Sequence, residues 1–447
     1  MSLNDQIARG KEDLRRLVAI PSVSARGERL EECANTVRDL LTEAGFATEI
    51  HPGEIGPFVV GEIGNGPLTI MVYNHYDVQP EDPVPLWHSA PFELSERDGK
   101  WFGRGVADDK GEFASRLAGW RLFRERNPGA LPFKLIWLVD GEEEIGSPSL
   151  EAFLKKRFAG ERVDACWWEY GEIDSDGRPI ILCGFKGVLG IELRCRTARA
   201  DLHSSLGAVF DNPLWRLASA VASMRDSRGR ILIPGFYDAV RAPTPEEEAI
   251  VQKPPFSFES LTAATGAQRA LEGIDEETFF RALNFEPCLN VNGFGGGYGG
   301  EGAKTVLPAD GFVKLDFRLV PDQNPREVTK LVRAHLDAQG FADIEIVVYD
   351  DIVKPVRSSP DHWFVQEAKP LLEAHFGKTA IVQPSSPASG TAHPFVEQLG
   401  AEIVGIGLTY HGAMLHSPNE NIIPEQFGTM VSFSADLFEA LSRRARG

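Results

Sequence analysis

Several short segments of the chain place histidines or carboxylates directly after an apolar run. His75 and Asp77 follow one such run, Glu143 and Glu144 follow a second, and Glu169 ends a third. In open α/β sheets, functional sites lie in the loops at the carboxyl ends of the strands. We therefore expect these side chains at one edge of a sheet, where imidazole nitrogens and carboxylate oxygens can bind metal ions.

Two further segments lie in predicted loops. Asp108 and Asp109 stand on a glycine-rich loop before a helix, and His416 stands in the loop before the last helix. Each signal alone has an ordinary interpretation, since an acidic pair can cap a helix and an acidic loop can be solvated. However, the acids between 140 and 144 repel one another at a strand end, and a bound divalent cation would remove that repulsion.

Taken together, these segments supply two imidazoles and three carboxylates, namely His75, Asp108, Glu144, Glu169 and His416. That is the ligand set of a two-metal hydrolytic site in which one carboxylate bridges the metals. Glu143 remains beside this set as a general base. Asp77 can hold the second ring nitrogen of His75 and so determine its tautomer.

The elements that must position these residues alternate between strand and helix. Apolar spacing predicts helices over residues 3–17, 28–44 and 111–125, and one that starts near 147. Apolar or alternating runs predict strands over 47–50, 59–63, 68–73 and 133–139. This order predicts an α/β domain with a mostly parallel sheet and helices on both faces.

The pattern changes after Gly187. Two stretches, 188–195 and 312–319, alternate like strands with one wet face, and 215–224 has the spacing of an amphipathic helix. They predict an α+β unit with an antiparallel sheet. Helices at 363–376 and 425–441, with a strand at 403–406, resume the α/β rhythm. We therefore predict a catalytic domain, 1–187 and 355–447, interrupted by an inserted domain, 188–354.

The composition excludes several classes of protein. The 447 residues carry a formal net charge of −19, which argues against nucleic acid and anionic membrane surfaces as main partners. No apolar run approaches the roughly 18 residues of a membrane span, and the first sixteen residues show no apolar signal segment. The five cysteines form no CxxC pair, so we expect buried, reduced thiols and a cytoplasmic location.

The segments above resemble those of the dinuclear-zinc metallopeptidases that include carboxypeptidase G, aminoacylase, succinyl-diaminopimelate desuccinylase and carnosinase-type dipeptidases. The match covers nearly the whole chain, in the same order. The matching motifs are His75-x-Asp77-Val78, Trp87-x-x-x-Pro91-Phe92, Gly103-Arg-Gly-Val-Ala-Asp108-Asp-Lys-Gly111, Glu143-Glu144-x-Gly146-Ser147, His203-Ser-Ser, Phe317-Arg318-Leu-Val-Pro321 and His416-Ser-Pro-Asn-Glu420.

The resemblance implies two divalent metal ions, with zinc as the first expectation and manganese or cobalt as alternatives. Asp108 would bridge them. His75 and Glu169 would complete the ligands of one ion, and Glu144 and His416 those of the other.

The resemblance also implies the catalytic roles. Glu143 would be the general base that acts on a water bridging the metals, and Asp77 would orient the imidazole beside it. The spacing departs from many relatives at one ligand. Glu169 follows Asp164 by five residues where those relatives have six, and Glu172 and Asp174 are further acids nearby.

For the inserted domain, the resemblance implies a lid that also forms a homodimer through its sheet. His203 would reach the partner's active site. Arg318 would grip the substrate carboxylate with its planar fork of donors. Ser389, Gly390 and Thr391 resemble the small-residue substrate loop of the family.

The implied activity is hydrolysis of the amide bond of a dipeptide or short peptide that has a free carboxylate. An N-acyl amino acid offers the same amide and the same carboxylate, so an aminoacylase-like deacylase stays open. A catalytically inert binding relative is the remote alternative, and the intact Glu143 and ligand set argue against it.

Two unrelated functions are excluded by context. Gly295-x-Gly297-x-x-Gly300 fits a dinucleotide-binding pattern formally, but an extended, proline-stopped segment follows it where a helix is required. The chain also contains no GxSxG motif, which a serine hydrolase of the α/β type would need.

Overall fold

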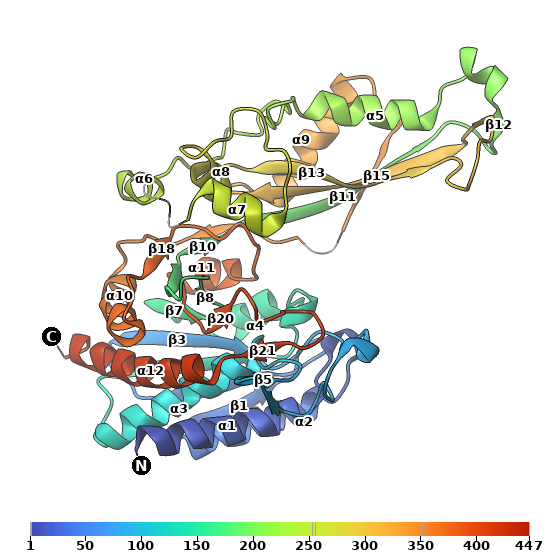
Figure 1. The fold of residues 1–447 in the computed structure, drawn as a ribbon. Helices are drawn as coiled ribbons and strands as arrows, with labels where there is room; N and C mark the ends of the chain where they lie inside the picture. The colour runs from blue at the N-terminus through green and yellow to red at the C-terminus, as the bar shows by residue number, and fades with distance from the viewer. Residues whose placement is uncertain (1, 253, 255, 350–351, 447) are drawn as a thin grey trace. The chain divides into compact units, whose positions relative to one another are not determined.

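The computed structural model describes residues 2–252, 254, 256–349 and 352–446. The chain divides into two compact units (Figure 1). Unit 1 comprises Met1–Gly184, Ser358–Pro384 and Pro394–Gly447, and unit 2 comprises Phe185–Arg357 and Ser385–His393. Among the described residues, no helix combines the length and the apolar character needed to cross a membrane.

Unit 1 is built on an eight-stranded mixed sheet. In spatial order its strands are β1 (Ala47–His51), β2 (Phe58–Ile63), β6 (Phe133–Asp140), β3 (Leu68–His75), β7 (Ala165–Trp168), β19 (Ile403–Gly405), β9 (Ile180–Leu182) and β18 (Ile381–Gln383). The pairs β6–β3, β3–β7, β7–β19 and β9–β18 are parallel. The pairs β1–β2, β2–β6 and β19–β9 are antiparallel.

Successive side chains of a strand point to opposite faces of a sheet, and the central strands β3, β6 and β7 carry runs of consecutive buried residues, so both faces of this sheet are buried. On β7, Trp167 packs against Phe433 of α12 (Pro424–Arg444), whereas Trp168 packs against Phe395 of α11 (His393–Leu399). Tyr73 of β3 also contacts Phe395. The predicted α/β domain with helices on both faces is therefore confirmed.

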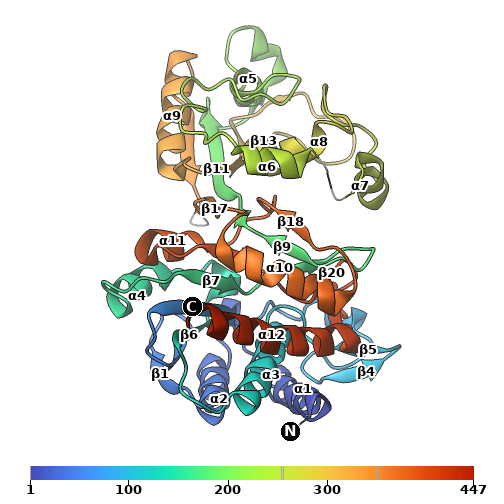
Figure 2. The same cartoon turned by 90° about the vertical axis from the view of Figure 1, so that its left-hand side faces the viewer.

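Helix α3 (Lys110–Arg126) lies beside α1 (Leu3–Val18) and α12 and contacts both of them (Figures 1 and 2). The other helices of the unit are α2 (Leu30–Glu43), α4 (Leu150–Arg157) and α10 (Trp363–Phe376). Close contact between α3 and α12 depends on Gly119, since a Cβ there would lie 2.4 Å from the Cβ of Ser434.

Short elements hold the loops of unit 1. A three-stranded sheet joins β4 (Ser95–Arg97), β5 (Lys100–Phe102) and β21 (Asn421–Ile422), and a two-stranded one joins β8 (Glu172–Ile173) to β20 (Thr409–Tyr410). The short 3-10 helices are η1 (Ser24–Arg26), η2 (Val84–Leu86) and η3 (Glu143–Ile145). A further pair, β10 (Gly184–Phe185) with β17 (Val356–Arg357), stands where the chain passes between the units in sequence.

Unit 2 is built on a four-stranded antiparallel sheet, as predicted. Its strands in spatial order are β13 (Cys288–Gly296), β15 (Asp310–Leu319), β11 (Gly187–Arg196) and β16 (Glu345–Val348). Its other elements are β12 (Leu202–His203), η4 (Ser204–Ala208), α5 (Pro213–Met224), α6 (Pro245–Val251), α7 (Phe258–Thr265), α8 (Phe279–Phe285), β14 (Val306–Leu307) and α9 (Pro325–Ala338).

Strand β15 shows why one face of this sheet is buried. Val313, Leu315 and Phe317 enter a core shared with α5 and α9, while Lys314 is exposed and Arg318 is half-buried on the other face. Period-two alternation in the sequence is the expected signature of such a half-buried strand.

The structure differs from the sequence analysis in several local features. Helix α4 begins at Leu150, later than predicted, because Glu142 holds the preceding turn through Ser149. The glycine-rich run after 293 belongs in part to edge strand β13, where a Cβ at Gly295 would lie 2.4 Å from the ring of Phe312. The cysteines are free and four are buried, but Cys288 is exposed.

Candidate metal centre

The candidate ligands come from neighbouring strand ends of unit 1. Strands β3 and β6 run parallel, and their last paired residues are His75 and Asp140. Glu143 and Glu144 follow β6 on η3, and Glu169 follows the parallel neighbour β7. Parallel strands end at the same edge of a sheet, which brings these side chains into one region.

Asp108 lies between the two histidines of the set. Its Oδ1 is 2.9 Å from Nε2 of His75, and its Oδ2 is 3.1 Å from Nε2 of His416. The same ring nitrogen of His416 lies 3.3 Å from Oε2 of Glu144. Each oxygen of Asp108 thus faces one imidazole, which is the arrangement that a bridging carboxylate requires.

Two groups of donor atoms share Asp108. One consists of His75, Asp108 and Glu169, and the other of Asp108, Glu144 and His416, with the donor atoms in each group within 4.8 Å of one another. Each group offers one imidazole nitrogen and carboxylate oxygens, a donor set that suits zinc and also accepts manganese or cobalt. The residues present therefore fit two divalent cations.

Electrostatics point the same way. Burial, together with the negative charges of Glu144 and Asp108, raises the pKa of Glu143 to about 8. Burial and the charge of Glu143 raise the pKa of Glu169 well above its usual range. Ionised carboxylates this close repel one another in a buried site, and divalent cations would stabilise them together.

Asp77 connects the histidine to the acidic loop. Its backbone oxygen lies 3.1 Å and its Oδ1 3.4 Å from Nδ1 of His75, so the other ring nitrogen faces Asp108. Its carboxylate also accepts hydrogen bonds from the backbone amides of Glu143 and Glu144, at 3.2 and 3.0 Å. One buried side chain thus orients both the imidazole and the loop that carries the acids.

The acids near Glu169 make other contacts. Glu172 accepts a hydrogen bond from the hydroxyl of Tyr170, and Asp174 pairs with Arg178. Glu169 is the acid of this segment that the structure brings to the histidine and Asp108.

Two polar residues near the centre have contacts that the sequence analysis did not predict. Asp109 accepts hydrogen bonds from the backbone amide of His75 and from the side chain of Asn74, at 2.9 and 2.7 Å. The buried guanidinium of Arg116 donates to the backbone oxygens at the ends of β3, β7 and β19, including that of Glu169. No sequence signal distinguishes Arg116, because it is one of several charged residues in the sequence of α3.

The remaining predicted site residues belong to unit 2. His203 is exposed on β12, with its Nδ1 2.8 Å from the hydroxyl of Ser205. Arg318 donates to Ser389 at 2.9 Å and to Asp316 at 3.2 Å. Gly390 and Thr391 follow Ser389 in the same segment of this unit. Their roles stay predictions.

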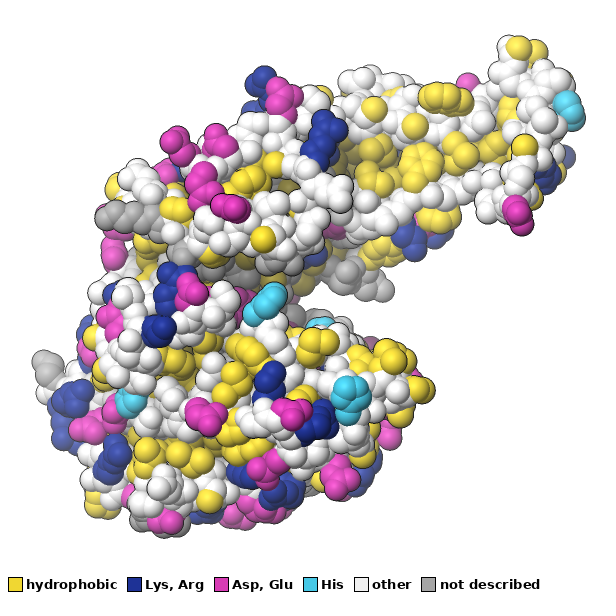
Figure 3. Space-filling model, viewed as in Figure 1, with side chains coloured by type: hydrophobic (Ala, Val, Ile, Leu, Met, Phe, Trp, Pro, Cys, Tyr) yellow, Lys and Arg dark blue, Asp and Glu magenta, His cyan; other side chains and the backbone are white. Residues whose placement is uncertain are grey.

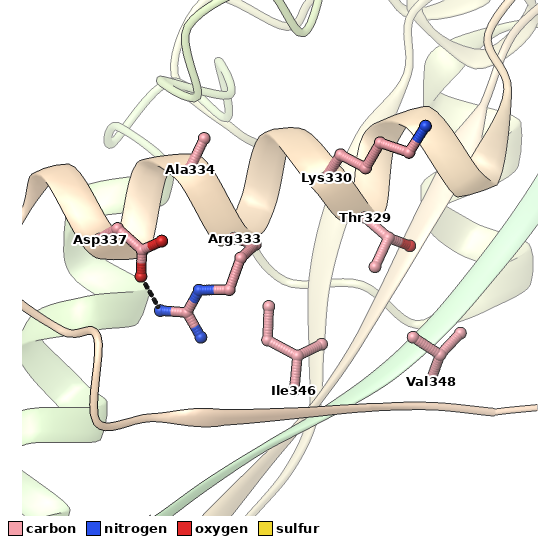
Figure 4. A pocket seen from close by; sticks show the side chains of 7 residues that line it. All are labelled: Thr329, Lys330, Arg333, Ala334, Asp337, Ile346 and Val348. Atoms are coloured by element: carbon pink, nitrogen blue, oxygen red, sulfur yellow. Dashed lines mark ion pairs between the residues drawn. The ribbon is translucent and has the colours of Figure 1, made fainter.

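A hollow of about 400 Å³ in unit 2 lies between α9 and β16 (Figure 4). Arg333 and Asp337 of α9 form an ion pair of 2.6 Å in its lining, and Ile346 and Val348 line it from β16. Its lining lacks a group of histidines and carboxylates, so this hollow offers no comparable chemistry.

Metal binding is expected to release protons and to weaken as the pH falls. Hydrogen bonds to Asp108 and Glu144 raise the pKa of His416 to about 10, so its ring holds a proton at neutral pH until a metal displaces it. For each displaced proton, affinity should fall about tenfold per pH unit below that pKa. Calorimetric titration with Zn²⁺ in buffers of different ionisation enthalpy measures the release, and zero protons would contradict the prediction.

Comparison with known proteins gives consistent matches over almost the whole chain. The family described as peptidase family M20/M25/M40 matches residues 71–440. The Cys-Gly metallodipeptidase dug1 of Schizosaccharomyces pombe is 28% identical over 440 residues, covering 93% of this chain and 91% of that protein.

Solved structures resemble this one closely. The M20 family metallo-carboxypeptidase Sso-CP2 from Sulfolobus solfataricus has a TM-score of 0.89 and 34% identity, covering 97% of this chain and 99% of that one. The di-peptidase Dug1p from Saccharomyces cerevisiae has a TM-score of 0.79 and 26% identity, covering 99% and 97%.

Proposed function

The chain belongs to peptidase family M20/M25/M40, and we propose that it is a metal-dependent dipeptidase that hydrolyses the amide bond of dipeptides with a free carboxylate. The observation that carries this proposal is the pair of ligand groups that share Asp108 beside Glu143. Relatives named as Cys-Gly metallodipeptidase and Beta-Ala-His dipeptidase support the substrate class.

The proposed chemistry divides between the metals and the protein. Two divalent ions held by these ligands would lower the pKa of water and polarise the amide carbonyl. Glu143 takes the proton of the attacking water and delivers it to the leaving nitrogen. Asp77 keeps the ring of His75 and the η3 loop in place during this transfer.

Arg318 is the proposed contact for the substrate carboxylate. Its guanidinium is half-buried and held by Asp316 and Ser389, so part of its ordering entropy is already lost before substrate binds. Gly390 and Thr391 would line the same part of the substrate site.

A second candidate function is removal of the C-terminal residue from longer peptides. The 34% identity to a metallo-carboxypeptidase structure favours it, and it needs the same free carboxylate.

A substrate panel tests the proposal. The panel would contain Cys-Gly, β-Ala-His, tripeptides, N-acetyl amino acids and dipeptides with an amidated C-terminus, each assayed with zinc, manganese and cobalt. We expect the free dipeptides to be cleaved fastest and the amidated ones to be poor substrates. Faster cleavage of tripeptides would favour the carboxypeptidase, and faster cleavage of N-acetyl amino acids would overturn the proposal in favour of a deacylase.

We propose zinc as the native metal. The donor sets mix imidazole nitrogen with carboxylate oxygen, which zinc accepts readily, although manganese and cobalt bind similar sets. Metal analysis of protein purified without added metal tests this assignment.

We also propose a cytoplasmic location. The free cysteines, with Cys288 exposed, fit a reducing compartment. Fractionation of the native cells tests it.

We propose that unit 2 forms a homodimer. Figure 3 shows hydrophobic side chains gathered over α5, β13 and β15. Trp215 of α5 is 74% exposed and Val209 is 75% exposed, while Phe294 is exposed on the edge strand β13. Unpaired sheet edges and apolar side chains of this kind favour pairing with an identical copy. His203 is exposed in the same unit, and its proposed role is to reach the active site of the partner.

Mixing two inactive variants is expected to restore activity if His203 acts in the partner's site. A heterodimer of His203→Ala and Glu143→Gln would contain one site with both defects and one with neither. Activity should therefore approach half of wild type per heterodimer. The loss caused by His203→Ala alone should be about 10²–10³-fold if the ring donates to the developing oxyanion. Confirmed subunit exchange without recovery would exclude the role in trans.

A further inference from the structure

Three of the sequence motifs contain residues that are not proposed metal ligands. In the structure these residues belong to one loop or contact it. The motifs are Trp87-x-x-x-Pro91, Gly103-Arg104-Gly and Asn419-Glu420. The loop is 103–109, which carries Asp108. Arg104 and Glu420 are each 1% exposed, although both are charged. A charged pair this deeply buried is costly unless every polar atom is well used, so its contacts are informative.

The carboxylate of Glu420 accepts four hydrogen bonds from this loop. Its Oε1 accepts from the backbone amides of Ala107 and Asp108, at 2.9 and 3.1 Å. Its Oε2 accepts from the amide of Gly105 at 3.0 Å and from Nη1 of Arg104 at 2.7 Å. The backbone amide of the proposed bridging ligand is therefore held directly by Glu420.

The segment around Glu420 is itself anchored. The backbone oxygen of Glu420 accepts a hydrogen bond from the backbone amide of Gly103 at 3.1 Å. The side chain of Asn419 accepts from the amide of His88 at 2.9 Å and donates to the backbone oxygen of Leu86 at 2.8 Å. His416 lies four residues before Glu420 in the same segment. This short segment therefore supplies one proposed metal ligand, His416, and also holds the loop that carries another, Asp108.

Arg104 extends this connection to the acidic loop. Its Nη2 donates to the backbone oxygen of Pro80 at 3.0 Å. The preceding residue, Gln79, donates from its side chain to Oε2 of Glu144 at 2.8 Å. The Arg104–Glu420 pair thus connects three segments of the chain. The first carries Asp108, the second carries His416, and the third carries Gln79, which contacts Glu144.

We propose that Glu420, paired with Arg104, is a positioning residue that sets the place of Asp108 between the two groups of metal ligands. The loop contains Gly103 and Gly105, which lose much backbone entropy when ordered. Without an acceptor for three of its amides, this loop would hold Asp108 in several positions. Because both ligand groups contain Asp108, Glu420 influences both metal sites. The inference rests on the proposed metal centre.

The test compares Glu420→Gln with a matched control on the same segment. Glutamine keeps the size of the side chain but replaces one acceptor oxygen with a donor that faces backbone amides. Glu425→Gln removes the same charge from the exposed first turn of α12. Metal-stripped protein is titrated with Zn²⁺ against a chelating indicator, and the absorption spectrum of the Co²⁺-loaded protein is recorded. Circular dichroism confirms that each variant is folded at the temperature of the titration.

We expect Glu420→Gln to weaken the binding of both ions by about 10–100-fold and to change the Co²⁺ spectrum, as the loss of contacts behind metal ligands typically does. Glu425→Gln should bind both ions as wild type does. A folded Glu420→Gln protein that holds two zinc ions with wild-type affinity would overturn the proposal, even if it unfolds at a lower temperature.

A second variant decides the case if Glu420→Gln does not fold. Arg104→Lys keeps the buried charge but loses the planar fork, so both affinities should fall, whereas wild-type affinities would overturn the proposal. Wild-type protein that binds no divalent ion would overturn the metal centre and this inference with it. Wild-type protein that binds two ions and cleaves no peptide would overturn the proposed function alone.

Discussion

Glu143→Gln protein is expected to retain both metal ions and to lose about 10²–10⁴-fold in kcat, the typical effect of removing a general base. Glutamine has nearly the same size as glutamate but cannot accept the proton of the attacking water. Burial and the surrounding carboxylates raise the pKa of Glu143 in the metal-free site, and two bound cations would favour the ionised carboxylate, which is the form that accepts the proton. Steady-state kinetics on a cleaved dipeptide, with metal analysis of the same sample, measures the effect.

The control for this prediction is Glu151→Gln, which removes an exposed carboxylate from the first turn of the nearby helix α4. Its kcat should equal that of wild type. A Glu143→Gln enzyme that keeps near-normal kcat with full metal content would refute the role of general base. Loss of metal from this variant would instead place Glu143 among the ligands.

Asp108→Ala protein is expected to lose both metal ions, because its carboxylate faces both imidazoles. Removing the shared ligand takes one donor from each group, so neither ion keeps its full set of ligands. Since each metal stabilises transition-state charge by several kcal/mol, activity should fall by about 10³-fold or more. Metal content after dialysis and the two zinc affinities provide the measurement.

The contrast for this prediction is His416→Ala, which removes a ligand from one group alone. That variant should weaken one affinity far more than the other, so the two variants differ in pattern and not only in size. An Asp108→Ala protein that still holds one ion tightly would show that Asp108 does not bridge.

Much of the fold followed from local sequence patterns. Helices α2, α3, α10 and α12 and strands β1, β2, β3 and β6 lie where apolar periodicity predicted them. Buried strands and amphipathic helices leave such patterns because their side-chain geometry repeats every two or 3.6 residues. The elements between 245 and 296 were not predicted, since helices α6–α8 are short and β13 is an exposed, glycine-rich edge strand.

The candidate ligands could be proposed from sequence because their chemistry is carried by residue type and by position after apolar runs. The structure brings His75, Asp108, Glu144, Glu169 and His416 together, although His416 is 308 residues from Asp108. Parallel strands that end at one edge make such a meeting predictable in outline. The roles of these residues, and those of His203 and Arg318, await the experiments above.

The sequence by itself determined the alternation of elements, the kinds of side chain at the strand ends and hence the class of chemistry. Only the tertiary structure decided which oxygen faces which nitrogen, and which buried groups hold the ligands in place. Asp109, Arg116 and Glu420 act through backbone amides and carbonyls of segments far away in the chain. A backbone donor or acceptor is the same at every residue, so no sequence pattern marks these contacts, and they exist only once the segments have packed together.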